Sequence, residues 1–350
     1  MAWLLSLRDL QWRRRRFAIG VVATALVFAL GLVLSGVRAS FDNEIDRTVD
    51  SFNADAWLLK AGSLGPFTAP RPLPASRAKA VRKLPGVRRA DPVVILGATT
   101  TTPEKRNLNL VGVVPRGVGS PPEEQARKLA APRGAIVDDR LGLDTGDRLE
   151  LNGADYRVRH ETHGMTYFAG VPRVTISVRQ AQRLGLDNQR LATAIVTQGR
   201  PAKVPAGLTM LENSEVAQDL ARPINPAKDT ISLIRFLLWG VAAGIIGAIV
   251  YLSVLERVRD FAVLKAIGAS SRDLLGGLLL QAVLLSLLSA LLAVGLEVAI
   301  APAVAMSVEV STATYLTLPG VAVGVGALAS FLGLRRAIVV DPALAFAGAG

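Results

Sequence analysis

Tyr251–Asp273 reads YLSVLERVRDFAVLKAIGASSRD, a short charged segment that separates two long apolar runs. Its apolar side chains recur at every third position, at Val258, Phe261, Leu264 and Ile267. This spacing predicts a helix that lies on a membrane surface with its charged face toward water. We expect Gly268 to end that helix in a left-handed cap and Ser270 or Ser271 to begin the next one. The alternative is an ordinary charged loop that only orients the neighbouring spans.

Four apolar runs of the chain are long enough to cross a bilayer. With a rise of about 1.5 Å per residue, about 20 residues cross a hydrocarbon core of about 30 Å. We expect the spans at residues 17–37, 229–255, 274–300 and 316–334. The 350 residues are 51% hydrophobic and 19% charged, a mixture typical of a membrane protein with a large water-facing part.

Basic residues next to these runs set the orientation. They lie before the first run, between the second and third, and after the fourth, at Arg8, Arg13–Arg16, Arg257, Arg259, Lys265, Arg272, Arg335 and Arg336. The positive-inside rule therefore predicts that the amphipathic N-terminus 1–16, the segment 256–273 and the tail 335–350 are cytoplasmic. Residues 38–228 and the short loop 301–315, which has neither Lys nor Arg, are then outside.

The first run has a second interpretation, as a cleaved signal peptide with Arg13–Arg16 as its basic start. It is longer than the apolar part of a typical signal peptide, and Arg38 fits a cleavage site poorly. Cleavage would also leave three spans and break the agreement between charge and topology. We therefore expect a retained span, and both termini inside the cell.

The outer part, residues 38–228, has the pattern of an α+β domain inserted between the first and second membrane helices. Apolar residues at helical spacing predict a stalk at each end, at Phe41, Ile45, Val49 and Phe52 and at Val216, Leu220 and Ile224. Strands are expected at 93–96, 108–113, 135–137 and 174–178, and short helices at 76–84 and 178–184. Asn152-Gly153 predicts the turn of a hairpin, while 62–74 and 116–132 read as loops.

The spans contain very few ionisable groups. Glu297 is the one charged residue inside a run, and we interpret it as facing the outer interface or a partner. Such scarcity argues against an ion-coupled carrier, because charges in membranes usually mark ion or proton routes. Small residues spaced four apart predict close helix packing, within or between protomers, at Gly240 and Gly244 and at Gly320 and Gly324.

Catalytic, metal and cofactor sites are not predicted for this chain. It has no Cys, and its two His fall in His160-Glu161-Thr162-His163, one residue short of the H-E-x-x-H zinc motif. Asp138-Asp139 are interpreted as turn or capping carboxylates. The sequence lacks the G-x-x-x-x-G-K-[ST] phosphate loop. The net charge of +12 is spread along the chain, so no nucleic-acid partner is expected.

ERVRDFAVLKAIGASSRDL closely resembles the signature of the FtsX-like, MacB-type ABC permeases, R-x-R-E-hydrophobic-x-hydrophobic-x-[KR]-A-x-G-A-S. The matching residues are Arg257, Arg259, Leu264, Lys265, Ala266, Gly268, Ala269 and Ser270. Asp260 stands where the family usually has Glu, which keeps the charge. The tail Arg335–Phe346 is similar to the family's closing motif, and Ala135–Val158 resembles its periplasmic core motif.

The resemblance implies a permease subunit in a bacterial cell membrane that works as a homodimer with a separate cytoplasmic ATPase, which would bind ATP and Mg²⁺. The ATPase would sit on a coupling helix formed by Glu256, Arg257, Arg259, Asp260, Phe261, Leu264, Lys265 and Gly268. The outer domain would move with the nucleotide state, to export or extract a substrate by mechanotransmission, with an extracytoplasmic adaptor as a further partner. The runner-up is a non-transporting scaffold that activates an outer partner such as a cell-wall hydrolase.

Overall fold

The computed structural model describes residues 14–256, 260, 263, 268, 270–303 and 309–337. The chain divides into two compact units, one formed by 1–40 with 227–350 and the other by 41–226. The first contains long helices and the second a sheet with short helices. This confirms the expected fold class, in which an α+β domain is inserted between the first and second membrane helices.

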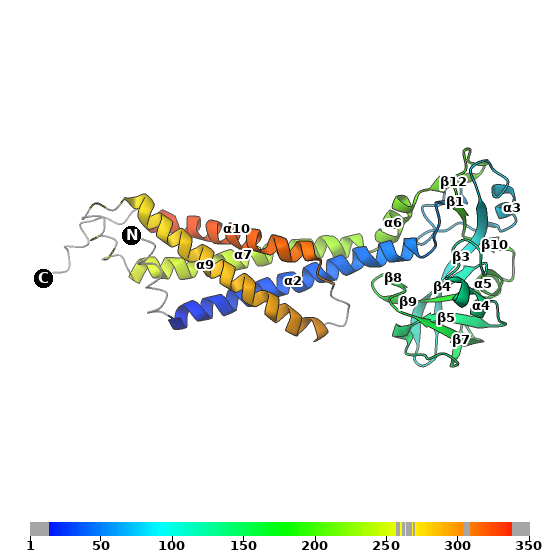
Figure 1. Cartoon of the computed structure of the whole chain (residues 1–350), viewed down its shortest axis with the longest axis horizontal. Helices are drawn as coiled ribbons and strands as arrows, with labels where there is room; N and C mark the ends of the chain where they lie inside the picture. Colours follow the sequence, from blue (N-terminus) through cyan, green and yellow to red (C-terminus); the bar gives the residue numbers. More distant parts are fainter. Residues whose placement is uncertain are drawn as a thin grey trace. The chain divides into compact units, whose positions relative to one another are not determined.

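Four helices in the described part of the chain are long and apolar enough to cross a membrane (Figure 1). They are α2 (Arg14–Asp50), α7 (Asn225–Glu256), α9 (Ser271–Ile300) and α10 (Thr312–Ala337), with a single 3-10 turn, η2 (Ala301–Ala303), after α9. Helix α2 is 37 residues long, far more than a span requires, because its amphipathic last turns belong to the second unit. The predicted first stalk is thus a continuation of the first membrane helix.

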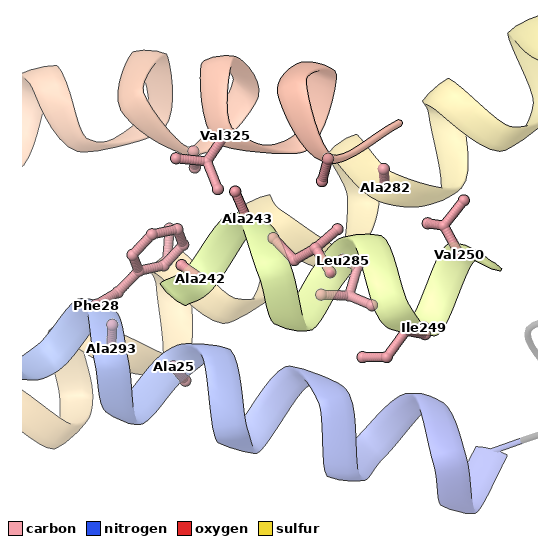
Figure 2. Packing of buried hydrophobic residues seen from close by; sticks show 14 of the residues in the cluster. Ala25, Phe28, Ala242, Ala243, Ile249, Val250, Ala282, Leu285, Ala293 and Val325 are labelled. Carbon is pink, nitrogen blue, oxygen red and sulfur yellow. The ribbon is translucent and has the colours of Figure 1, made fainter. Parts of the chain in front are cut away.

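Small and branched apolar residues fill the core of the helical unit. Figure 2 shows Ala25 and Phe28 of α2 beside Ala242 and Ile249 of α7. Gly326 allows close helix contact, since a Cβ there would lie 2.7 Å from Ser286 Oγ and 3.0 Å from the Ala282 carbonyl oxygen. A Cβ on Gly20 would lie 2.2 Å from Ile249 Cδ1, the end of a flexible side chain, and one on Gly247 would make an ordinary contact, 3.5 Å from the Ala329 carbonyl oxygen. The sequence pattern did not indicate these three positions.

The glycines that the sequence predicts to pack closely lie on other faces of the helices. Gly240 and Gly244 of α7 and Gly320 and Gly324 of α10 are on exposed faces. A Cβ added to any of them would meet no described atom within 4 Å. Packing within the protomer therefore does not use these four positions, and packing between protomers is the interpretation that remains.

One mixed sheet organises the second unit. Its strands follow the order β12-β1-β11-β3-β4-β9-β5-β7-β6, and β8 pairs with β9 off this path. The β4–β9 and β5–β7 pairs are parallel and the others antiparallel. The strands are β1 (Ala56–Lys60), β3 (Arg89–Thr100), β4 (Arg106–Val113), β5 (Gly134–Asp138), β6 (Arg148–Leu151), β7 (Ala154–Thr162), β8 (Thr166–Tyr167), β9 (Val171–Ser177), β11 (Ala194–Gln198) and β12 (Leu208–Leu211). Strands β2 (Leu73–Pro74) and β10 (Leu191–Ala192) form a separate pair.

The predicted hairpin is confirmed, because β6 and β7 pair antiparallel around Asn152-Gly153. Both turn residues have positive φ, 47° and 83°, as a type I′ turn requires. The predicted short helices are present as α3 (Arg77–Val81) and α5 (Val178–Gly185). A further 3-10 turn, η1 (Asp139–Leu141), follows β5, and α6 (Asn213–Ala221) lies near the end of the unit.

The prediction of a loop over 116–132 is wrong in part, because it contains helix α4 (Glu123–Leu129). The helix follows Pro122 and buries Ala126 and Leu129 against the sheet. Two ion pairs at i, i+4 spacing join Glu123 to Arg127 and Glu124 to Lys128. Seven residues are too short for a clear periodic signal, so burial against the sheet decides the structure here.

Candidate functional site

The elbow between α7 and α9 is the region that the sequence predicts to bind a partner. The structure describes it at Asp260, Val263, Gly268 and Ser270, all of which are exposed. Gly268 has a φ of +103°, in the region that favours glycine, as its predicted role at the helix end requires. The Ser270 carbonyl accepts a hydrogen bond from the Leu274 amide, 3.3 Å, at the start of α9. Arg257, Arg259, Phe261, Leu264 and Lys265 lie outside the described residues.

Glu256, at the end of α7, is held by a polar network at this end of the bundle. Its Oε1 is 2.6 Å from Nη1 of Arg16 on α2. The same guanidinium donates to Ser253 Oγ, 2.8 Å, and this hydroxyl also accepts from Gln281 Nε2 of α9, 3.2 Å. The network joins three helices directly before the elbow. The sequence placed Glu256 among the partner-facing residues, but its carboxylate is engaged within the protomer.

The interior of the bundle offers few free polar atoms. Ser286 and Ser289 donate to carbonyls four residues earlier, Ala282 and Leu285, and Ser330 donates to the Leu278 carbonyl. Such local bonds satisfy the hydroxyls without a polar path along the helices. Among the described residues of the spans, Thr24 Oγ1 and Arg235 Nε are the buried side-chain atoms left without a partner.

Glu297 needs a correction. Its carboxylate is 3% exposed and accepts a hydrogen bond from the Tyr315 hydroxyl, 2.8 Å. The residue is therefore buried between α9 and α10 of its own protomer. The expectation that it faces a partner is wrong, because Tyr315 of the same protomer supplies the donor that a buried carboxylate needs. Its position near the end of α9 leaves the outer-interface alternative as a prediction.

In the second unit, Glu44 near the end of α2 anchors that helix to the β8–β9 loop. Its carboxylate is 6% exposed and accepts from Thr166 Oγ1, from the Ala169 amide (3.1 Å) and from the Gly170 amide (2.8 Å). Phe168, Ala169 and Gly170 all have positive φ, 57° to 86°. Successive residues in this conformation can turn their amides toward one anion. The sequence showed Glu44 as one of several charges on an amphipathic helix and gave no sign of this role.

Arg173 on β9 adds a buried charge to the same anchor. Nη1 donates to Ser51 Oγ, 2.7 Å, and Nε to Thr175 Oγ1, 3.1 Å. The guanidinium also lies over the Phe52 ring, 5.0 Å from its centre. Burial lowers the pKa of Arg173 to about 10, so the group keeps its charge at neutral pH.

The second stalk is held in a similar way by Asp219 on α6. This carboxylate is 1% exposed and accepts from the amides of Phe67 and Thr68 and from the Thr68 hydroxyl. The Phe67 ring in turn contacts Tyr167 and Phe52 edge-on, with ring centres 5.4 and 6.1 Å apart. The anchors of α2 and α6 therefore meet in one aromatic cluster of Phe52, Trp57, Phe67, Tyr167 and Phe168.

The comparisons with known proteins decide the family. Residues 232–342 match the model of the FtsX-like permease C-terminal domain. An uncharacterized ABC transporter permease of Mycobacterium tuberculosis is 39% identical over 344 residues, 98% of this chain and 99% of the relative. A second one from the same species is 37% identical over 347 residues, with the same coverage. The chain belongs to the FtsX-like ABC transporter permeases. The family resemblance noted from the sequence is thus confirmed.

Two solved structures are similar to the second unit of this FtsX-like permease, residues 41–226, which is called the outer unit below. The periplasmic region of MacB from Actinobacillus actinomycetemcomitans has a TM-score of 0.34 at 9% identity and covers 50% of this chain and 96% of its own. The extracellular domain of the ABC-type transporter YknZ from Gram-positive bacteria has a TM-score of 0.31 at 11% identity, covering 42% and 83%. TM-scores this low do not support a family assignment. The family is assigned from the family model and the relatives.

One histidine of the permease, His163, is paired with a carboxylate. His163 Nδ1 is 3.0 Å from Asp139 Oδ2. Within the described ranges, no group of three or more His, Asp or Glu has the geometry to hold a metal ion. The adjacent Asp138 accepts from the Arg140 amide at the start of η1 and from the Met165 amide, 2.6 Å. The predicted capping role of Asp138 is confirmed.

The electrostatics of this cluster differ from residue to residue. Burial raises the pKa of Asp138 to about 6. The hydrogen bond from His163 lowers the pKa of the exposed Asp139 and raises that of His163. Asp138 also ties the β7–β8 segment to β5 through Met165, one residue before the Thr166 that contacts Glu44.

Proposed function

We propose that this permease couples ATP hydrolysis by a separate cytoplasmic ATPase to movement of its extracytoplasmic unit. The observation that carries the proposal is helix α2, which supplies both a membrane span and, through Glu44, the anchor of the β8–β9 loop. A shift of that helix would reach the sheet through a buried, charge-assisted contact. ATP and Mg²⁺ would be bound by the partner, and this chain would carry out no catalysis.

The polar groups of the spans favour mechanical transmission rather than transport through a pore. Most buried polar side chains of the described bundle bond to one another or to helix backbone carbonyls. A polar substrate would therefore find few free donors and acceptors along the described spans. Movement of the outer unit, for export or extraction, requires no such route.

The elbow 256–273 is the proposed seat of the ATPase. The Arg16–Glu256–Ser253–Gln281 network lies next to it and joins helices α2, α7 and α9. A push on the elbow would thus act on three helices together. We also propose a homodimer that uses the exposed α10 face around Gly320 and Gly324, since small residues allow two helices to approach closely.

The proposed orientation places both termini and Lys265 in the cytoplasm and Lys105 outside. A membrane-impermeant amine label on intact cells should modify Lys105 and spare Lys265. Labelling of both residues from the same side would reject this topology and, with it, the proposed coupling.

Co-expression with the ATPase of its own gene neighbourhood tests the proposal. The wild-type permease should co-purify with the ATPase, while Phe261→Asp or Leu264→Asp should lose co-purification and coupled activity but keep membrane insertion, because a carboxylate is buried at the contact. Leu64→Asp is the matched control, since Leu64 is 64% exposed in the outer unit. Coupled activity that survives both elbow substitutions would refute the coupling role.

The runner-up function is a scaffold that activates an extracytoplasmic enzyme without moving cargo. The absence of a polar route in the described spans fits this function as well. The same purified complex separates the two functions. Cargo-dependent ATP hydrolysis supports transport, and stimulation of a wall hydrolase without cargo supports the scaffold.

A further inference from the structure

Two arginines lie together in the helical unit, at the end where α2 continues into residues 41–50. Nη1 of Arg38 on α2 donates to the Ser232 hydroxyl and to the Lys228 carbonyl oxygen (3.3 Å), both on α7. Arg235 follows Ser232 by three residues, so it lies on the same face of α7. The hydrogen bond to Ser232 therefore places the Arg38 guanidinium on the face of α7 that carries Arg235.

Helix geometry places this pair at a membrane boundary. Residues 17–37 and 236–255 contain no charged side chain. A rise of about 1.5 Å per residue puts Arg38 about 33 Å from Arg16 along α2, and Arg235 about 31 Å from Glu256 along α7. A hydrocarbon core is about 30 Å thick. The Arg16–Glu256 ion pair therefore marks one face of the hydrocarbon layer, and Arg38 and Arg235 the other.

The two faces of the hydrocarbon layer differ in how the charges of these arginines are balanced. Arg16 has the carboxylate of Glu256. Arg38 donates to two neutral oxygens, and Arg235 Nε is buried without a hydrogen-bond partner among the described residues. Arg235 instead lies over the Trp239 ring, 5.8 Å from its centre. Two neighbouring cations without a carboxylate, next to hydrocarbon, are stabilised when an anion binds between them.

An exposed apolar surface adjoins the cationic pair. On α7, Leu233, Phe236 and Leu237 are 59%, 67% and 56% exposed in the protomer. They flank Arg235 at the level where headgroups meet acyl chains. A ligand that fits both features has an anionic head and hydrocarbon tails.

We propose that Arg38 and Arg235 bind the phosphate of an anionic phospholipid, whose acyl chains lie along Leu233, Phe236 and Leu237. Arginine suits this ligand because its planar fork of donors can hold two phosphate oxygens at once. Trp239 is the aromatic side chain typical of that depth. On the proposed topology the lipid lies in the outer leaflet. This choice of leaflet rests on the proposed function, whereas the binding site itself does not.

Native mass spectrometry of the full-length permease with phosphatidylglycerol tests the site without an ATPase. The double variant Arg38→Gln/Arg235→Gln should bind this lipid about tenfold more weakly, since hydrogen bonds to charged groups are lost. The matched control is Arg179→Gln/Arg183→Gln, which removes the same charge from exposed positions on α5 and should bind like wild type. Arg235→Lys keeps the charge but not the fork, and should give an intermediate loss.

Two further arms identify the ligand. Phosphatidylcholine should bind equally to wild type and the double variant, and millimolar inorganic phosphate should not displace phosphatidylglycerol. Equal phosphatidylglycerol binding by wild type and the double variant, or displacement by inorganic phosphate, would overturn the proposal. If the double variant is not monodisperse, Arg235→Lys is compared with wild type in its place. Phosphatidylglycerol binding by Arg235→Lys equal to that of wild type would then refute the proposal. Because no ATPase is present, failure here leaves the co-purification test intact.

Discussion

The helical unit and the outer unit treat buried polar groups in opposite ways. In the bundle, several buried serines bond within their own helix, as Ser286 and Ser289 do, and apolar contacts make most of the packing. In the outer unit, buried carboxylates bond to distant segments, as Glu44 and Asp219 do across more than 100 residues of sequence. The helices are thus held by many weak, exchangeable contacts, and the sheet by a few specific ones. This would suit the proposed coupling, in which the helices shift and the outer unit moves as one body.

Removing a specific contact from the outer unit should have the largest effect. Glu44→Ala leaves the Ala169 and Gly170 amides buried without an acceptor, and should lower the free energy of unfolding of this unit by about 3 kcal/mol. Asp46→Ala, two residues away on the exposed side of α2, should change it by less than about 0.5 kcal/mol. Limited proteolysis and thermal unfolding of the full chain measure both. Equal effects would show that Glu44 does not act as a specific anchor in the outer unit.

Overpacking should reveal which glycines hold the bundle together. Gly326→Leu would drive a side chain into Ser286 and Ala282, and should destabilise the protomer by about 2 kcal/mol. Gly320→Leu points into open space in the protomer and should leave its stability unchanged, while weakening the proposed dimer. Thermal unfolding and cross-linking separate the two effects. A stable Gly326→Leu protomer would show that the bundle lacks the tight packing described.

The change of folding stability with pH should be the smallest effect. It tests the outer unit separately from the helical unit, because both titrating groups, Asp138 and His163, lie there. The pKa of Asp138 rises from 3.8 to about 6 on folding, so the native state binds the proton more tightly than the unfolded state. Stability from this group therefore falls as pH rises from about 4 to 6. The raised pKa of His163 acts in the same direction above pH 6.5.

Asp138→Asn removes the titration of the buried carboxyl. The variant should lose part of the stability difference between pH 5 and pH 7.5, on the order of 1 kcal/mol. Chemical denaturation at the two pH values measures it. An unchanged difference in Asp138→Asn would assign the whole effect to other groups, such as the Asp139–His163 pair.

Local patterns predicted much of the fold. Hydrophobic length identified the helices that became α2, α7, α9 and α10, and Asn152-Gly153 identified the β6–β7 hairpin. Helix α4 was missed because seven residues carry too little periodicity. The signature in the elbow predicted the family, although most of its partner-facing residues lie outside the described part of the chain.

Sequence alone determined the membrane spans, the inserted domain and the family, because each depends on residues close together along the chain. Tertiary structure decided which glycines pack, where Glu297 is buried and what Glu44 holds. Those outcomes depend on which face of a helix meets a segment far away in sequence. A glycine at Gly240 and one at Gly247 are equivalent as letters, but Gly247 approaches the backbone of Ala329 and Gly240 meets open space.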